Sequence, residues 1–157
     1  MSQVNEPTVG RFNHASIPVR DLKEAKRFYT EVLGGEVILD SNPTFAEVRV
    51  GGAVIGLSEQ SGGWTDANAE FPHYAFTMAA DDFYPFIEKL KARGVTTAPA
   101  WTRHGVEALM YFRDPSGNLL ELYCERGVKD ADKLPRLVKA GGNLTIDFAA
   151  LKYDWRG

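Results

Sequence analysis

The sequence predicts an α+β fold in which two βαβββ modules form a half-barrel cleft, and an internal repeat is the observation behind it. Each half of the chain begins with an alternating strand that carries a histidine, continues with a helix-forming segment and a glycine, and ends in further strands. His14 and Gly34 are 20 residues apart, and His73 and Gly94 are 21 residues apart. Two such units can close their sheets together into the cleft, which the inward faces of eight strands would line.

Three segments are expected. Residues 1–10 are polar and predict a disordered leader, and residues 11–126 hold the paired modules, one over 11–59 and the other over 73–124. Residues 127–157 predict an irregular C-terminal extension, because Pro135 and the pair Gly141 and Gly142 interrupt any period. Its apolar residues lead us to expect that it packs over the site or clasps a partner subunit.

The first module predicts a strand over 11–19 and a helix over 22–33. Asp21 has the spacing from Glu24 that a capping box needs at a helix N-terminus. Gly34 and Gly35 can adopt the backbone conformation that ends a helix. Strands follow over 36–39, 45–50 and 53–58, and the last two are joined by a tight glycine turn.

The second module repeats this plan. It predicts a strand over 73–78, a helix over 82–92 that ends at Gly94, and strands over 95–98, 107–113 and 118–124. The last two strands form a hairpin around the DPSG sequence of residues 114–117, which is typical of a tight turn.

Composition restricts the class of function. The chain has 157 residues with a net charge of −3 and no run of Lys and Arg, which disfavours a nucleic acid or an anionic membrane as partner. Its apolar runs are strand-length, and the polar N-terminus lacks a signal-peptide core, so we expect a cytoplasmic protein. The single cysteine, Cys124, is expected to be a buried apolar residue.

A carboxylate is predicted to point inward from the last strand. In the sequence NLLELYC, Glu121 shares one face with Leu119 and Tyr123, while apolar residues take the other. Burying a carboxylate is costly unless a positive group compensates it, and a divalent metal is a strong compensator. His14 and His73, at equivalent points of the repeat, would complete a set of three ligands.

A simpler interpretation applies to each residue alone. A strand histidine is most often a hydrogen-bonded surface or core residue, and an inward glutamate usually has an arginine partner. The chain contains only three histidines, and two of them hold equivalent positions in the repeat. This coincidence favours the metal site.

These residues carry a resemblance to the vicinal oxygen chelate superfamily, which includes glyoxalase I, extradiol dioxygenases, fosfomycin-resistance thiol transferases and bleomycin-resistance proteins. The resemblance spans residues 12–124 and rests on FNHASIPVRDLKEAKRFYTEVLGG, HYAF and YFRDPSGNLLELY. In motif the chain looks closest to single-domain members that are similar to extradiol dioxygenases. The resemblance implies a homodimer, in which His14 comes either from the same chain as His73 and Glu121 or from the other.

The ligand count bears on the reaction. Aligning the turn at Gly52 with the turn at Gly117 places Gly56 opposite Glu121, and glycine offers no ligand. Glyoxalase-like members typically have four protein ligands, one of them from this strand. A set of two histidines and one carboxylate leaves positions open, which suits Fe(II) that binds both O2 and a chelating substrate.

Two further residues receive roles from the resemblance to extradiol dioxygenases. Tyr111 would donate a hydrogen bond to a substrate hydroxyl, and His104 would act as acid or base or orient a bound catechol. Tyr111 also shares the alternating face of Leu109 and Arg113, which predicts an inward hydroxyl. His104 lies in a polar turn, where a histidine is more often only solvated.

The first hypothesis is therefore an Fe(II) extradiol-type dioxygenase that opens an aromatic diol, with Phe12, Trp101 and Tyr123 against the flat ring. The second keeps the metal, as Zn(II), Ni(II) or Mn(II), in the role of Lewis acid in a glyoxalase-like isomerase or lyase or in a thiol transferase. After residue 100 we find no counterpart of the phosphonate-contacting Ser, Lys and Arg cluster of the fosfomycin-resistance group. The third hypothesis is a binding protein without catalysis, similar to bleomycin-resistance proteins.

Overall fold

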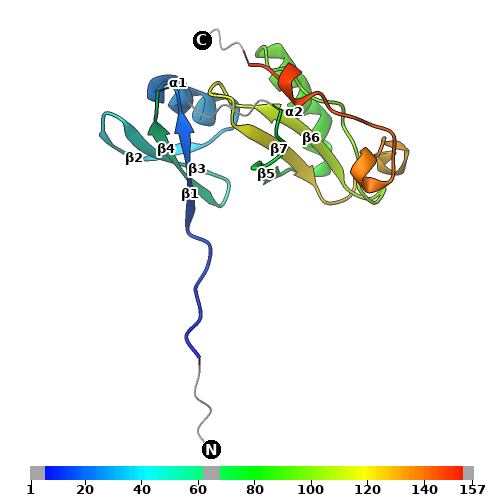
Figure 1. Ribbon diagram of the computed structural model, residues 1–157, viewed down its shortest axis with the longest axis horizontal. Helices are drawn as coiled ribbons and strands as arrows, with labels where there is room; N and C mark the ends of the chain where they lie inside the picture. Colours follow the sequence, from blue (N-terminus) through cyan, green and yellow to red (C-terminus); the bar gives the residue numbers. More distant parts are fainter. Residues whose placement is uncertain (1–5, 62–67, 154–157) are drawn as a thin grey trace, which may run out of the picture.

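The computed structural model describes residues 6–61 and 68–153 and confirms the α+β class, with one helix-and-sheet module in each half of the chain (Figure 1). The strands and longer helical elements are, in chain order, β1 (His14–Val19), α1 (Leu22–Arg27), a π-helical turn (Phe28–Val32), β2 (Glu36–Asn42), β3 (Phe45–Val50), β4 (Ala53–Glu59), β5 (Tyr74–Thr77), α2 (Ala80–Ala92), β6 (Ala108–Arg113) and β7 (Leu119–Cys124). Three short 3-10 helices follow in the described part of the C-terminal extension, Ala131–Lys133, Val138–Ala140 and Phe148–Ala150. Within these described ranges no helix is long and apolar enough to cross a bilayer.

The modules form two separate sheets, which lie side by side under their helices (Figure 1). The first has the order β1-β4-β3-β2 and the second β5-β7-β6. In each sheet, the first strand of the module pairs in parallel with the last strand, β1 with β4 and β5 with β7. β1 and β5 are therefore edge strands of their own sheets.

The strand predicted over 95–98 does not form, which is a correction to the expected eight strands. Pro99 has no N–H to donate to a ladder, so the segment meets β6 only at separate points, where Ala98 and Trp101 donate to its carbonyls at 2.9 Å. Val95 instead forms an isolated bridge with Tyr153 of the C-terminal extension. Part of the segment predicted as a strand therefore pairs with the C-terminal extension.

The first helix also differs from the prediction. Asp21 caps it as expected, because its side chain accepts the N–H of Glu24 at 2.8 Å. After Arg27 the backbone widens into a π-helical turn, where the Thr30 hydroxyl donates to the Lys26 carbonyl at 2.9 Å. That carbonyl is the one an α-helix would pair with the N–H of Thr30, so the side chain competes with the regular ladder.

The N-terminal strand is shorter than predicted. Residues 11–13 lie outside β1, and Phe12, which we expected to line the cleft, is 85% exposed. The residues before it form no helix or strand from residue 6 onward, and the first five residues of the predicted leader lie outside the described ranges. Strand β5 likewise begins one residue later than predicted, so His73 lies directly before it.

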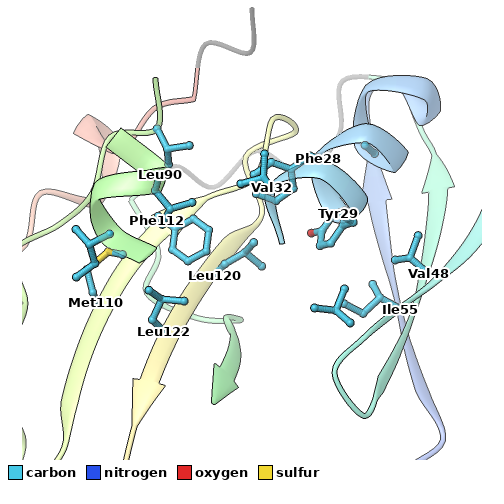
Figure 2. Packing of buried hydrophobic residues seen from close by; sticks show 14 of the residues in the cluster. Phe28, Tyr29, Val32, Val48, Ile55, Leu90, Met110, Phe112, Leu120 and Leu122 are labelled. Carbon is cyan, nitrogen blue, oxygen red and sulfur yellow. The ribbon is translucent and has the colours of Figure 1, made fainter. Parts of the chain in front are cut away.

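One hydrophobic core is shared by both modules (Figure 2). Phe28, Tyr29 and Val32 project from the first helical segment toward Phe112 and Leu120 of the second sheet, and all five are fully buried or nearly so. Burial of this apolar surface is the main force that holds the two modules together.

The DPSG turn adds a polar connection between the modules. The Asp114 carboxylate accepts backbone N–H bonds from Ser116 at 2.9 Å and from Asn118 at 2.8 Å, and it accepts the Tyr29 hydroxyl at 2.9 Å. The Asn118 amide in turn donates to the carbonyl of Pro18, at the end of β1, at 2.8 Å. The turn of one module is therefore fixed to the helix and strand of the other.

The C-terminal extension packs on the second sheet through its own hydrophobic cluster. The cluster joins residues of β6, β7 and the preceding segment to three residues of the extension, namely Ala98, Trp101, Leu109, Tyr111, Leu119, Leu137, Ile146 and Leu151. These β6 and β7 side chains alternate with those that face the shared core, so the extension covers the face opposite to it. Cys124 lies on the core side and is buried, as predicted.

Candidate metal centre

Strand β7 carries Glu121 on the face covered by the extension, and β5 brings His73 beside it. Glu121 pairs in register with Ala75, two residues after the histidine. His73 Nε2 lies 3.0 Å from Glu121 Oε2, and the Glu121 side chain is 3% exposed. A nearly buried carboxylate thus has an imidazole as its direct partner.

Both ring nitrogens of His73 face acceptor oxygens. Nδ1 lies 2.8 Å from the carbonyl oxygen of Glu70, and Nε2 faces Glu121. The hydrogen bond to Glu121 raises the pKa of His73, burial opposes this, and the Glu70 carbonyl adds to the increase. Each ring nitrogen therefore has an oxygen within hydrogen-bond distance.

This arrangement fits a divalent metal. An imidazole and a carboxylate already converge, and both are common ligands of such ions. A metal-binding histidine usually donates its other N–H to a carbonyl or carboxylate, which fixes the ring. The contact of His73 Nδ1 with Glu70 supplies that support, so Nε2 is the nitrogen that would bind the ion.

Tyr111 is brought to the same centre, with its hydroxyl directed inward as predicted. The hydroxyl donates to Glu70 Oε1 at 3.0 Å, and the ring meets that of His73 edge-on, with centroids 5.2 Å apart. Burial, and then the charge of Glu121, raise the pKa of Tyr111. The hydroxyl therefore stays protonated and can act as a hydrogen-bond donor.

His104 is not brought to the centre. It lies in the turn before β6, where its side chain is exposed and its backbone N–H donates to Glu107 at 2.5 Å. The predicted catalytic role of His104 gains no support from this position.

His14 lies on the other sheet. Its side chain is exposed on β1, and its Nδ1 lies 2.6 Å from the side-chain oxygen of Asn13. Across residues 6–61 and 68–153, no three His, Cys, Asp or Glu side chains come together as a metal site. One chain therefore unites two of the three predicted ligands.

The strand registers support the predicted equivalence of Gly56 and Glu121. Ser16 and Ala75 each lie two residues after a histidine, and their strand partners are Gly56 and Glu121. A Cβ on Gly56 would lie 2.5 Å from Ser16 Oγ and 3.1 Å from the ring of Phe45. Glycine offers no ligand here, and the side chains of Ser16 and Phe45 lie against the position that a Cβ would take.

The structure adds two residues that the sequence did not single out. Glu70 and Lys139 form an ion pair beside Tyr111, although they are 69 residues apart and neither lies in a strand or an α-helix. No periodicity or motif links such positions. Glu59, the carboxylate at the end of β4, is used at the start of α1, where its Oε2 accepts the N–H of Leu22 at 2.8 Å.

A comparison with known families decides the classification. The family model described as the Glyoxalase/Bleomycin resistance protein/Dioxygenase superfamily matches residues 11–122. The chain belongs to this superfamily. The predicted resemblance to the vicinal oxygen chelate proteins is thereby confirmed.

Curated members of the superfamily point to particular reactions. Glutathione transferase FosA of Serratia marcescens is 35% identical over 114 residues, which cover 71% of this chain and 78% of that protein. A probable lactoylglutathione lyase of Vibrio parahaemolyticus is 32% identical over 125 residues, covering 72% and 89%. Both names describe enzymes, and neither describes a dioxygenase.

A solved structure agrees with the fold. The fosfomycin resistance protein FosX of Listeria monocytogenes, in a mutant form with Mn(II) and 1S,2S-dihydroxypropylphosphonic acid, has a TM-score of 0.65 at 23% identity. The match covers 80% of this chain and 96% of that one. This similarity confirms the architecture of the superfamily for the present chain.

Proposed function

We propose that the protein is a metal-dependent transferase that adds a thiol to a small electrophilic substrate, with a divalent metal as Lewis acid. The contact between His73 and the buried Glu121 carries this proposal. The two relatives are named as a glutathione transferase and a lactoylglutathione lyase, and these names support a reaction that involves a thiol. They give no support to Fe(II) or to ring opening of an aromatic diol, which was the first hypothesis from the sequence.

The metal would be held by His73 and Glu121 of one subunit and by His14 of its partner. Two features support a second copy. The strands β1 and β5 are both sheet edges, whose open backbone groups favour pairing with another strand. In addition, Phe12 and Phe71 each lie two residues before a histidine and are 85% and 63% exposed, which is typical of residues that an interface buries.

The number of ligands favours the transferase over the lyase. Glyoxalase-like members typically take a fourth protein ligand from the strand position that Gly56 occupies here. Gly56 has no side chain to supply that ligand, and Ser16 and Phe45 lie close to it. A three-ligand centre leaves open positions for an oxygen of the substrate.

The residues of the centre then have distinct tasks. When bound, the metal supplies Lewis-acid polarisation of a substrate oxygen. His73 and Glu121 would hold the ion, and the Tyr111 hydroxyl, kept protonated by burial, donates its one proton to Glu70 and offers its oxygen as an acceptor that orients the substrate. Mn(II) is the first metal to test, because the FosX structure contains it together with a small diol that bears a phosphonate.

Mixing two inactive variants tests the shared site. His14→Ala and His73→Ala each remove a ligand from every site of a homodimer. In a mixed dimer, one site keeps both histidines if the ligands come from two chains. Random exchange of subunits should then restore about a quarter of the wild-type metal content and activity. No restoration after proven exchange would refute the two-chain arrangement.

The reaction is tested with the Mn(II)-loaded protein. We expect fosfomycin and a thiol, supplied in turn as glutathione and L-cysteine, to give a covalent adduct that mass spectrometry detects. Glu121→Gln should abolish the product while leaving the fold intact by circular dichroism. Oxygen uptake with catechol after reconstitution with Fe(II), in the absence of any thiol adduct, would refute the proposal and favour the dioxygenase. Isomerisation of the methylglyoxal–glutathione adduct alone would favour the lyase.

A further inference from the structure

We propose that the C-terminal extension positions the metal ligand His73, and that Lys139 and Glu70 are the positioning residues through which it acts. The inference rests on the metal site of the proposed function. It concerns a segment that lies beyond residue 122, where the match to the superfamily ends. The contacts form a continuous chain from the extension to the imidazole.

The first contact fixes the ring. The carbonyl oxygen of Glu70 lies 2.8 Å from His73 Nδ1 and holds Nε2 toward Glu121. Glu70 and His73 are only three residues apart, on the segment that leads into β5. Any shift of the backbone at Glu70 therefore rotates or releases the imidazole.

The second contact fixes Glu70. Its Oε1 accepts both the hydroxyl of Tyr111 at 3.0 Å and the ammonium of Lys139. The Glu70 side chain is only 17% exposed, so its charge needs both donors. Tyr111 comes from the rigid strand β6, whereas Lys139 comes from the extension, so the carboxylate is held from two directions.

The third contact fixes Lys139. Its ammonium lies 5.1 Å from the ring centroid of Phe71 and 5.7 Å from that of Trp101, which are cation–π distances. The short helical turn that carries it, Val138–Ala140, follows Leu137, which is buried in the cluster under the extension. The position of Lys139 is thus set by packing on the second sheet.

The role of Lys139 is tested by metal affinity. Lys139→Met keeps the length and apolar stem of the side chain and removes only the charge. Titration of metal-free protein with Mn(II) should show affinity weakened by about tenfold, at the lower end of the range for outer-shell residues. Lys133→Met is the matched control, since Lys133 lies in the same extension and pairs with the exposed Asp130. It should leave the affinity unchanged.

A second measurement needs no metal. The 15N chemical shifts of the His73 ring report which nitrogens carry protons, and Lys139→Met should change them in the metal-free protein while Lys133→Met should not. Glu70→Gln should produce a similar change. The double variant Lys139→Met with Glu70→Gln should weaken Mn(II) binding by no more than the larger single effect, because both act through one contact.

The outcomes separate the two proposals. If wild type binds Mn(II) and Lys139→Met matches it in both affinity and ring shifts, the positioning role is refuted and the metal site stands. If the unfolding temperature of Lys139→Met falls while the ring shifts remain, the residue is only structural and the inference fails. If wild type binds no Mn(II), Zn(II) or Ni(II) but the ring shifts respond, the proposed function fails and the positioning of His73 stands.

Discussion

Removal of the Tyr29 hydroxyl should destabilise the protein by an amount that increases with pH. Tyr29→Phe keeps the ring in the core and deletes only the donor to Asp114, which lies 2.9 Å away; both side chains are buried. A hydrogen bond to a charged acceptor contributes roughly 1.5–3 kcal/mol, and a neutral one about 1 kcal/mol. We therefore expect a loss of about 2 kcal/mol in the free energy of unfolding where Asp114 is ionised.

The direction of the pH dependence follows from the pKa of Asp114. Burial raises this pKa above its ordinary value, and the hydrogen bonds from Asn118 and Tyr29 oppose the increase. A carboxyl with a raised pKa in the folded state favours folding at low pH, and this contribution is lost as the pH rises through the folded pKa. In Tyr29→Phe the pKa of folded Asp114 rises further, because a hydrogen bond that lowers it is gone. The variant therefore loses more unfolding free energy than the wild type as the pH rises, and the loss continues to a higher pH.

Urea denaturation of wild type and variant at one protein concentration, between about pH 4 and pH 8, measures this difference. The gap in the free energy of unfolding should be about 1 kcal/mol at the acid end and should widen toward neutral pH. Tyr84→Phe, at an exposed tyrosine of α2, should give a gap near zero at every pH. A gap for Tyr29→Phe that is constant or narrows with rising pH would refute the electrostatic reasoning.

Other perturbations test the packing and the metal site. Gly35→Ala should cost more than about 2 kcal/mol, because its Cβ would lie 2.7 Å and 2.8 Å from two backbone oxygens, whereas Gly52→Ala, with open space around it, should be nearly neutral in thermal unfolding. Leu137→Ala should cost about 2–3 kcal/mol of unfolding free energy through the cavity under the extension, and the exposed Val138→Ala less than about 0.5 kcal/mol; equal costs would contradict the packing described. Mn(II) at about 100 times its Kd should stabilise the protein by about 2.7 kcal/mol, and both chelation and His73→Ala should remove this gain.

The elements of the fold could be predicted where local pattern decides them. The repeat, the alternation of faces along β6 and β7, and the cap at Asp21 depend on neighbours in sequence, and the structure confirms them. The π-helical turn was not predicted, because no repeat or spacing in the sequence marks where the Thr30 hydroxyl takes the Lys26 carbonyl. The strand over 95–98 was wrong because Pro99 and a distant segment of the chain determine its pairing.

The candidate site also has some residues that the sequence could predict and others that it could not. The position of Glu121 beside His73, and of Gly56 at the equivalent point, follows from strand register and could be predicted. The pair of Glu70 and Lys139 depends on how two irregular segments fold over a sheet, which no period reveals. The role of His104 was predicted from the resemblance alone and stays a prediction, because the exposed turn that carries this residue does not bring it beside His73.

The edge strands of the two sheets differ in how readily another strand can pair with them. The edge strand β2 is irregular, because its register against β3 shifts twice. The edge strand β6 is partly covered by the proline-containing segment over 98–101. Among the edge strands of the described ranges, this leaves β1 and β5, one in each sheet, as regular edges with open backbone groups. In the proposed dimer, each copy could offer β1 and β5 to the other, which would occupy both regular edge strands and leave neither for a third copy.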